Sequence, residues 1–275
     1  MNQCCFPRES ASCELIKSIS INNKIFRLDF VWPGAAPRAG QFFMIKPKRG
    51  SLFLARPISV ALWEPDAHTV KFLIARRGKG TCELAELRPG EEAELTGPLG
   101  NAWADFPADK KSEKKQIALI GGGIGIAPLQ ALAAELPENS FDFFAGFKTG
   151  FRSLEEKSNL LGPALFGSAR LTVAEETISN NLLAKIQGGR IPDFLNPANY
   201  AAVYACGPEA MLEAVAEKCV AAEVPCYVSM ERRMACGVGA CLGCTVTTSR
   251  GNRRCCADGP IFPASEVFAS EMRLQ

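Results

Sequence analysis

The residues best suited to chemistry are cysteines near the C-terminal end of the 275-residue chain. Cys236, Cys241 and Cys244 are spaced C-x4-C-x2-C, and either Cys255 or Cys256 follows after a short hairpin-like stretch. This spacing is typical of plant-type ferredoxins, in which four thiolates hold two irons bridged by two sulfides. A four-cysteine zinc site is the alternative, although zinc sites usually pair two C-x2–4-C arms. The spacing therefore predicts a [2Fe–2S] cluster.

Three glycines lie among these cysteines. Gly237, Gly239 and Gly243 are predicted to give the loop backbone angles that other residues rarely adopt. They also allow backbone N–H groups to approach the sulfurs, which offsets the charge of a cluster and helps to set its potential.

A glycine-rich loop follows an apolar run at 117–120. Gly121, Gly122, Gly123 and Gly125 end this expected strand and open a helix, which is the context in which such a loop binds a diphosphate. The spacing is not G-x-G-x-x-G, so a plain tight turn is the alternative from the residues alone.

A second corner lies further along the chain. Cys206, Gly207 and Pro208 end a later apolar strand at the same carboxyl edge of the expected sheet, where open α/β sheets bind ligands. Cys206 is therefore a candidate catalytic residue at this edge. The alternative is that Cys206 is a small residue closing a buried strand.

The elements that must position these residues fall into two patterns. Residues 13 to about 100 alternate short β-rich runs with Gly and Pro turns, which favours an antiparallel sandwich or barrel. A charged linker follows at 107–116. From Ile117 the chain alternates apolar strands, at 117–120, 140–147, 170–175 and 201–206, with helices at 128–136 and 208–223. This alternation predicts a parallel sheet with helices on both faces. Residues 150–170 and 176–199 carry no clear pattern.

Composition excludes several classes of function. The formal net charge is +2 and hydrophobic residues make up 47%, so nothing indicates a nucleic-acid partner. No apolar run approaches the roughly 20 residues of a membrane helix, and no signal peptide is recognisable. We therefore expect a cytoplasmic protein without membrane contact. The single histidine, His68, nearly excludes His-based triads and His-rich metal sites.

Several motifs, in this order along the chain, resemble the ferredoxin–NAD(P)H reductase superfamily. They are RPIS at Arg56–Ser59, GKGT at Gly78–Thr81, GPLG at Gly97–Gly100, GGGIGIAP from Gly121 and ACGPE around Cys206. The cysteine-rich tail narrows the resemblance to the electron-transfer subunits of class 1B dihydroorotate dehydrogenases. The resemblance covers roughly residues 24–262. It implies an N-terminal antiparallel FAD-binding β-barrel domain at 10–106, a doubly wound NAD-binding α/β domain at 116–225, and a small [2Fe–2S] module at 226–275.

The resemblance also implies residue roles. Arg56 would meet the FAD diphosphate, Ser59 would lie near the flavin ring, and Cys206 would lie near the nicotinamide ring. The implied flavin-binding residues are Arg56, Pro57, Ile58, Ser59, Leu73, Ile74, Ala75, Gly80 and Thr81, of which Leu73 to Ala75 would act through their backbone. Cys256, and not Cys255, aligns with the family's ligand because only Cys256 begins the C-x-DGP element. The implied cluster ligands are Cys236, Cys241, Cys244 and Cys256.

The implied function is electron transfer in pyrimidine (UMP) biosynthesis. In the resembling enzymes, dihydroorotate reduces FMN on a partner subunit, and electrons cross the cluster and FAD to NAD+. The three modules use up this chain and leave no room for an FMN-binding barrel of about 250 residues. We therefore expect a catalytic partner subunit, in a heterotetramer of two of each chain.

Alternatives remain open at this point. One alternative is a related reductase subunit that passes electrons to a ferredoxin-, sulfide- or glutamate-linked partner. Another is a zinc-stabilised nucleotide-binding regulator, which would be colourless when purified because zinc and nucleotide do not absorb visible light. Lys148 and Arg152 could reach a 2′-phosphate, so NADP remains an alternative to NAD.

Overall fold

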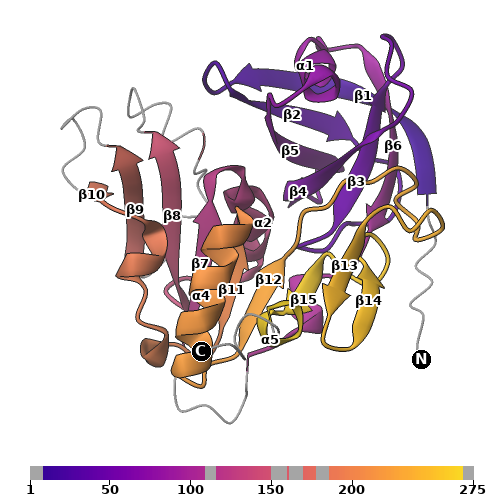
Figure 1. Cartoon of the computed structure of the whole chain (residues 1–275). Helices are drawn as coiled ribbons and strands as arrows, with labels where there is room; N and C mark the ends of the chain where they lie inside the picture. The colour runs from indigo at the N-terminus through magenta and orange to yellow at the C-terminus, as the bar shows by residue number, and fades with distance from the viewer. Residues whose placement is uncertain (1–8, 109–115, 150–159, 161–169, 178–185, 269–275) are drawn as a thin grey trace.

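The computed structural model describes residues 9–108, 116–149, 160, 170–177 and 186–268. These residues form an antiparallel barrel, a mainly parallel sheet with helices, and a cysteine-rich segment that contacts both (Figure 1). The predicted fold class is thereby confirmed. Within the same residues, no helix is both long enough and apolar enough to cross a membrane.

Six antiparallel strands close the barrel in the order β1-β2-β5-β4-β3-β6. Their bounds are β1 Glu9–Ser20, β2 Ile25–Val31, β3 Phe42–Pro47, β4 Arg56–Glu64, β5 Thr69–Ala75 and β6 Glu92–Leu99. A short helix, α1 (Lys79–Ala85), connects β5 to β6. Inside, Trp32 meets Phe43 and Phe43 meets Phe72 edge to face, at ring-centroid distances of 4.9 and 5.6 Å. Such pairs each add about 0.5–1.5 kcal/mol beyond the area that they bury.

The second sheet has the strand order β10-β9-β8-β7-β11-β12-β15. All neighbouring strands are parallel except β15, which runs antiparallel to β12. The bounds are β7 Ile117–Gly122, β8 Phe141–Thr149, β9 Arg170–Thr177, β10 Ile186–Gly188, β11 Val203–Cys206, β12 Cys226–Ser229 and β15 Ile261–Pro263. The order reverses between β7 and β11, and the carboxyl ends of strands at such a reversal form the usual ligand crevice.

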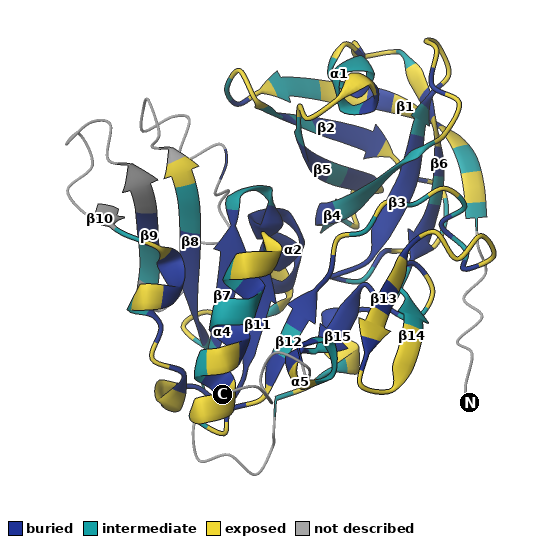
Figure 2. Cartoon of the chain, viewed as in Figure 1, coloured by how far each residue is buried: buried dark blue, intermediate teal, exposed yellow. Residues whose placement is uncertain are grey.

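Helices cover both faces of this sheet, as predicted. Ala118 and Ile120 of β7 pack in one core with α4 (Glu209–Ala221), whereas Leu119 packs in another with α2 (Ile126–Glu135). Strands β7 and β11 are accordingly almost entirely buried, while the outer side of α4 faces solvent (Figure 2). Short 3-10 turns η2 (Gly123–Gly125), η4 (Ile191–Phe194) and η5 (Pro197–Asn199) complete this part.

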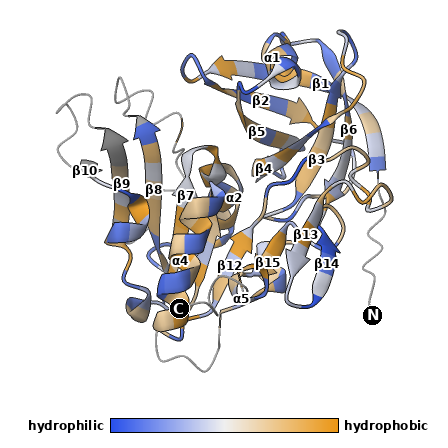
Figure 3. Cartoon of the chain, viewed as in Figure 1, coloured by the Kyte–Doolittle hydropathy of each residue, from blue (hydrophilic) through white to orange (hydrophobic). Residues whose placement is uncertain are grey.

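The cysteine-rich segment leaves the sheet after β12 and returns to it as β15. Between them lies a hairpin of β13 (Thr245–Thr248) and β14 (Gly251–Arg254), with β14 hydrophilic along its length (Figure 3). A short helix, α5 (Ala264–Val267), follows β15. The division of the chain at 225/226 stays a proposal, and β12, which follows it, pairs with β11 of the parallel sheet.

Polar contacts hold the barrel against the sheet. The indole N–H of Trp103, in η1 (Trp103–Asp105), donates to the Pro128 carbonyl over 3.1 Å, and the Tyr204 hydroxyl donates to the Phe106 carbonyl over 2.8 Å. The Ala39 amide donates to Oε1 of Glu135 over 3.0 Å. Two of these contacts reach α2 and one reaches β11, so they hold the helix-covered side of the sheet against the barrel and the segment that follows it.

Candidate functional site

One pocket lies where the barrel, the sheet and the cysteine-rich segment meet. Three segments predicted from the sequence line it together: 57–59 at the start of β4, 73–75 at the end of β5, and Thr81 in α1. Gly125 in η2 and Cys206 at the end of β11 line it from the side of the sheet. Phe42, Ile124 and Pro260 add to the apolar wall. An apolar pocket with a few polar groups suits a flat aromatic ring system such as a flavin.

Arg56 and Gly80 lie together at the side of this pocket, although neither lines it. A Cβ at Gly80 would come within 2.1 Å of the Arg56 Nε, so the arginine crosses the helix where only glycine leaves room. Nη1 of Arg56 donates to the Leu54 carbonyl over 2.7 Å. The Thr81 hydroxyl accepts from the Arg77 amide over 2.9 Å, which fixes the turn before α1. This cationic turn can hold a diphosphate.

The glycine loop and the Cys-Gly-Pro corner touch each other backbone to backbone. A Cβ at Gly125 would lie 2.3 Å from the Cys206 carbonyl oxygen, and one at Gly122 would lie 2.8 Å from Cδ of Pro208. Gly121 packs in the same way against Ile126, while Gly123 has a φ of +55° and open space around its Cα. The glycines thus serve close packing at three positions and a left-handed turn at the fourth.

Cys206 closes β11 inside this contact and is only 3% exposed. Burial, with a smaller contribution from the nearby Glu231 carboxylate, raises the pKa of its thiol to about 12, although a hydrogen bond with Ser229 acts in the opposite direction. At neutral pH Cys206 is therefore a neutral thiol that can contact a ring but is not a thiolate nucleophile. Its catalytic role stays a prediction.

The predicted cluster cysteines surround one short loop. Cys256 Sγ lies 3.2 Å from Cys244 Sγ and accepts from the Gly239 amide over 3.1 Å. The Cys236 sulfur accepts from the amides of Val238 and Cys241 over 3.4 and 3.5 Å. Amide donors of this kind stabilise thiolates and tune a cluster, so this donor set fits an iron–sulfur group.

The surroundings of the thiols shift their pKa values in opposite directions, down for Cys236 and up for Cys256. Burial alone would raise the pKa of Cys236, but the amide hydrogen bonds outweigh burial and lower it to about 6. Burial and the adjacent Cys244 raise the pKa of Cys256 to about 12. If Cys256 held a metal, the metal would have to displace this proton as it bound. In the described residues, no three Cys, His, Asp or Glu side chains gather around one point as they would around a single ion.

Cys255 and Cys256 point in different directions. Cys255 is fully buried and its thiol donates to the Met230 carbonyl over 2.9 Å. Burial, followed by the neighbouring Cys244 and Cys256, raises the pKa of Cys255 to about 12. The Cys256 amide instead donates to the Cys244 sulfur over 3.4 Å. This geometry favours Cys256 as the fourth ligand, and the assignment stays a prediction.

Two of the three loop glycines behave as predicted. Gly237 and Gly239 have φ values of +68° and +82°, and a Cβ on Gly237 would come within 2.7 Å of Met44 in the barrel. Gly243 is different, because its φ is not in the left-handed region and its Cβ position meets only the Cys241 sulfur, at 3.5 Å. The left-handed residue in that turn is its neighbour Leu242, with a φ of +58°.

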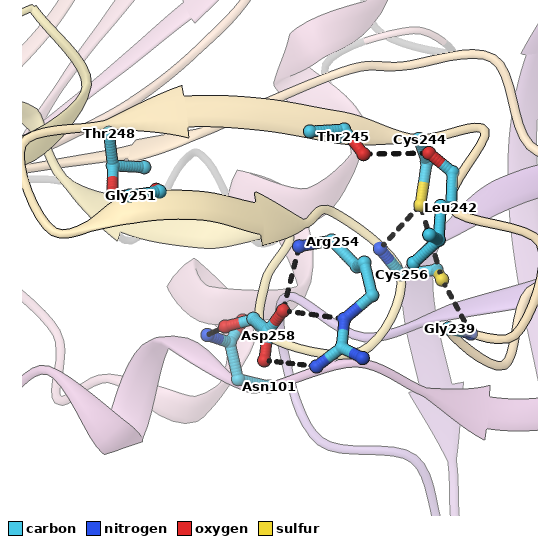
Figure 4. A network of polar contacts seen from close by, with 10 residues as sticks. All are labelled: Asn101, Gly239, Leu242, Cys244, Thr245, Thr248, Gly251, Arg254, Cys256 and Asp258. Carbon is cyan, nitrogen blue, oxygen red and sulfur yellow. Dashed lines mark hydrogen bonds and ion pairs between the residues drawn. The ribbon is translucent and has the colours of Figure 1, made fainter.

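A polar network that the sequence did not reveal surrounds the turn that carries Cys256 (Figure 4). The Arg254 guanidinium grips Asp258 through Nε and Nη2 over 3.0 and 3.2 Å, and the Arg254 amide reaches the same carboxylate over 2.7 Å. The Asn101 side chain donates to the carbonyls of Asp258 and Ile261 and accepts from the Ile261 amide. The end of the barrel thereby anchors the Cys256 turn.

Sequence reasoning did not place the segment between β12 and Cys236 in this pocket. Met230, Glu231, Arg232 and Met234 all line the pocket, together with Arg77. Arg232 forms a two-pronged ion pair with Glu209 at the start of α4, with Nη2 to Oε1 at 2.9 Å. These residues lie in no glycine or cysteine motif, so their spacing gave no reason to predict that they line a pocket.

Of the two residues considered as partners of a 2′-phosphate, the structure describes only Lys148. Lys148 is exposed near the carboxyl end of β8. Arg152 lies outside the described residues.

Comparison with known proteins agrees with this geometry. Residues 231–268 match the family described as the iron-sulfur cluster binding domain of dihydroorotate dehydrogenase B. The dihydroorotate dehydrogenase B (NAD(+)) electron transfer subunit of Clostridium perfringens is 40% identical over 233 residues, covering 83% of this chain and 86% of the relative.

The corresponding subunit of Clostridium acetobutylicum is 34% identical over 258 residues, covering 94% of this chain and 97% of its own length. Among solved structures, a chain of the NADH-dependent reduced ferredoxin-NADP oxidoreductase superposes with a TM-score of 0.73 at 25% identity, covering 96% of this chain and 92% of that one. From these similarities over nearly its whole length, the chain belongs to the family of dihydroorotate dehydrogenase B (NAD(+)) electron transfer subunits.

Proposed function

We propose that this chain carries electrons from the FMN-containing catalytic subunit of dihydroorotate dehydrogenase, through a [2Fe–2S] cluster and FAD, to NAD+ in pyrimidine biosynthesis. The observation that carries the proposal is that the pocket and the cysteine loop are joined by one continuous segment of chain. One pocket is lined by the flavin segments and by Cys206, and the segment that forms its remaining wall, Met230 to Met234, leads directly to Cys236.

Each group of residues has a proposed task. Pro57, Ile58 and Ser59, with the backbone of 73–75, bind and orient the flavin, while Arg56, Gly80 and Thr81 hold its diphosphate. The glycines at 121, 122, 123 and 125 shape the floor on which the nucleotide lies. When bound, FAD exchanges both hydrides and single electrons, so it can join a nucleotide to an iron–sulfur cluster.

The neutral thiol of Cys206 and the apolar wall keep water from the reacting face. Cys236, Cys241, Cys244 and Cys256 hold the cluster, with the loop amides as donors to their sulfurs.

The dihydroorotate site belongs to the partner in this proposal. The pocket of this chain takes its wall from the segments already assigned to flavin and nucleotide, and the relatives are named as electron transfer subunits. We further propose a heterotetramer with two copies of each subunit. We place the complex in the cytoplasm because thiols that bind iron must stay reduced.

A related reductase with a different partner is the second candidate. The similarity to the NADH-dependent reduced ferredoxin-NADP oxidoreductase favours it, because that structure superposes on 96% of this chain. Four cysteines in ligand spacing, together with the names of the 34% and 40% identical relatives, favour the dihydroorotate system.

A reconstitution experiment tests the proposal. The chain is purified alone and together with the FMN-containing dihydroorotate dehydrogenase subunit of the same organism. We expect the isolated chain to oxidise NADH with an artificial acceptor but not dihydroorotate, and the complex to reduce NAD+ with dihydroorotate. Dihydroorotate turnover by the isolated chain would show that the substrate site is misplaced. A complex that is inactive with dihydroorotate but active with reduced ferredoxin would favour the second candidate.

A further inference from the structure

Leu242 combines two unfavourable features in the turn between two cluster cysteines. Its φ of +58° lies in the left-handed region, where a side chain with a Cβ is strained, and its surface is 61% exposed. The described part of the chain has four non-glycine residues with positive φ, namely His68, Asn139, Glu223 and Leu242, and Leu242 is the only apolar one. Backbone strain of this kind often marks a functional position.

The same loop shows what the backbone alone would require. At its two other left-handed positions the loop has glycines, Gly237 and Gly239, which adopt such angles without strain. Those glycines are buried against Met44 and Ala257. At the third position the chain carries leucine, and the Thr245 hydroxyl fixes the turn by donating to the Leu242 carbonyl over 2.7 Å (Figure 4). Glycine would serve the turn better, so the side chain itself is the feature to explain.

The cover over the cluster site is thinnest at this turn. Cys241 is the exposed member of the four proposed ligands, whereas Cys244 and Cys256 are buried and Cys236 is half-buried. The run from Ala240 to Gly243 is exposed throughout and carries no charged side chain. Electron transfer between proteins weakens steeply with distance, so a redox partner must approach where the cluster is least covered.

We infer that Leu242 is the apolar anchor by which this subunit docks on the FMN-containing catalytic subunit. This inference rests on the proposed function. The leucine side chain enters an apolar pocket of the partner and brings the Cys241 side of the cluster against the partner surface. Buried apolar anchors dominate the affinity of many interfaces, and the left-handed backbone holds the leucine away from its own subunit so that it remains available.

Binding measurements with substituted subunits test the inference. The full-length holo-subunit is titrated with the FMN-containing catalytic subunit by isothermal calorimetry. Leu242→Gly removes the side chain and the strain, and Leu242→Asn keeps similar bulk in a residue that tolerates the left-handed region. We expect both to raise the Kd of the complex about tenfold or more, since a leucine loses its burial, while Leu242→Met binds like wild type.

The control is Val220→Ser, which removes an apolar side chain that is 49% exposed on α4, outside the cluster loop. We expect it to leave the Kd unchanged. Leu242→Gly should also raise the Tm of the isolated subunit because its strain is relieved, so stability and affinity move in opposite directions. A Kd within about twofold of wild type for both Leu242→Gly and Leu242→Asn overturns the inference.

A second measurement needs no variant. Hydrogen exchange of the wild-type subunit is compared with and without the catalytic subunit. Slower exchange in the peptide spanning 240–243 supports the inference, and unchanged exchange there in a formed complex overturns it. If the wild-type chains form no complex at all, the proposed function itself fails, which is a different result from a complex that ignores Leu242.

Discussion

The four proposed cluster ligands come from one stretch of chain, 236–256, whereas the pocket takes its walls from segments between Phe42 and Pro260 that lie on both domains. In the first site, the loop makes its own donors, since the amides of Val238, Gly239 and Cys241 reach the sulfurs. In the second, Gly125 and Cys206 meet only because β7 and β11 are neighbours in the sheet.

This difference predicts different responses to substitution. A site built from one local segment should be lost when its ligand residues are substituted, and it should tolerate substitutions elsewhere in the chain. A site assembled from distant segments should be sensitive wherever two backbones must approach closely.

The largest effect is expected at the cluster. Cys256→Ser should lose or strongly destabilise the cluster because serine is a poor substitute for a thiolate, whereas Cys255→Ser should keep it because Cys255 bonds to the Met230 carbonyl instead. Visible absorbance and iron content of the two purified variants measure the outcome. Full cluster content in the Cys256 variant, with loss in the Cys255 variant, would reverse the assignment.

A methyl group should disrupt the pocket almost as severely. Gly125→Ala places a Cβ 2.3 Å from the Cys206 carbonyl and 2.8 Å from the Gly207 Cα, which are backbone atoms that cannot swing away. We expect about 1–3 kcal/mol of lost unfolding free energy and weakened NADH binding, measured by denaturant melts and by flavin reduction kinetics.

Gly243→Ala is the matched control, since its Cβ would make only an ordinary contact at 3.5 Å. If both variants behaved alike, close backbone approach would not be what the pocket depends on.

The flavin should respond next. Arg56→Ala removes a charge-assisted contact to the proposed diphosphate and should weaken FAD retention by about 2 kcal/mol, roughly 30-fold in Kd. Flavin content after dialysis and fluorescence titration of the apoprotein measure this loss.

Arg49→Ala serves as the control because the exposed Arg49 side chain pairs with the half-buried Glu91 and donates to the Glu86 carbonyl, and such surface contacts contribute little. Equal flavin content in wild type and the Arg56 variant would remove Arg56 from the binding site.

The smallest effect is expected where the two sites are joined. Asn101→Ala removes the side chain that contacts the carbonyls of Asp258 and Ile261 and the Ile261 amide. We expect about 1–2 kcal/mol less stability, together with faster bleaching of the cluster on warming. Normal bleaching at reduced stability would mean that the Cys256 turn holds itself without the barrel.

The sequence predicted well what local spacing encodes. The β13–β14 hairpin and the strand preceding each glycine corner were expected within a residue or two of where they lie. The barrel strands from β2 to β6 were also expected, because Gly and Pro turns separate their apolar runs.

The features that were not predicted are either too short or too exposed to show a pattern, or depend on residues far apart in the sequence. Helix α1 is too short to show periodicity, and β1 carries many polar residues because much of it is exposed. The wall formed by Met230 to Met234 and the clamp of Arg254 on Asp258 follow from where β12 and β15 place the loop. Leu242 took the left-handed angle expected of Gly243 because a turn can be completed at either neighbour, and only three-dimensional packing decides between them.

The pairing of β12 with β15 has a topological consequence. Val228 faces Phe262 and Ser229 faces Ile261 in this antiparallel pair, and the Met230 amide donates to the Pro260 carbonyl over 2.9 Å. The two strands thus form a β-hairpin whose turn has grown to contain the entire cluster module, residues 231–259. The hairpin ladder already holds the ends of this insertion together. Binding of a cluster therefore does not have to offset the entropy lost when the loop is closed. Loss of iron should therefore loosen the insertion while its two ends stay attached to the sheet, ready to receive a cluster again.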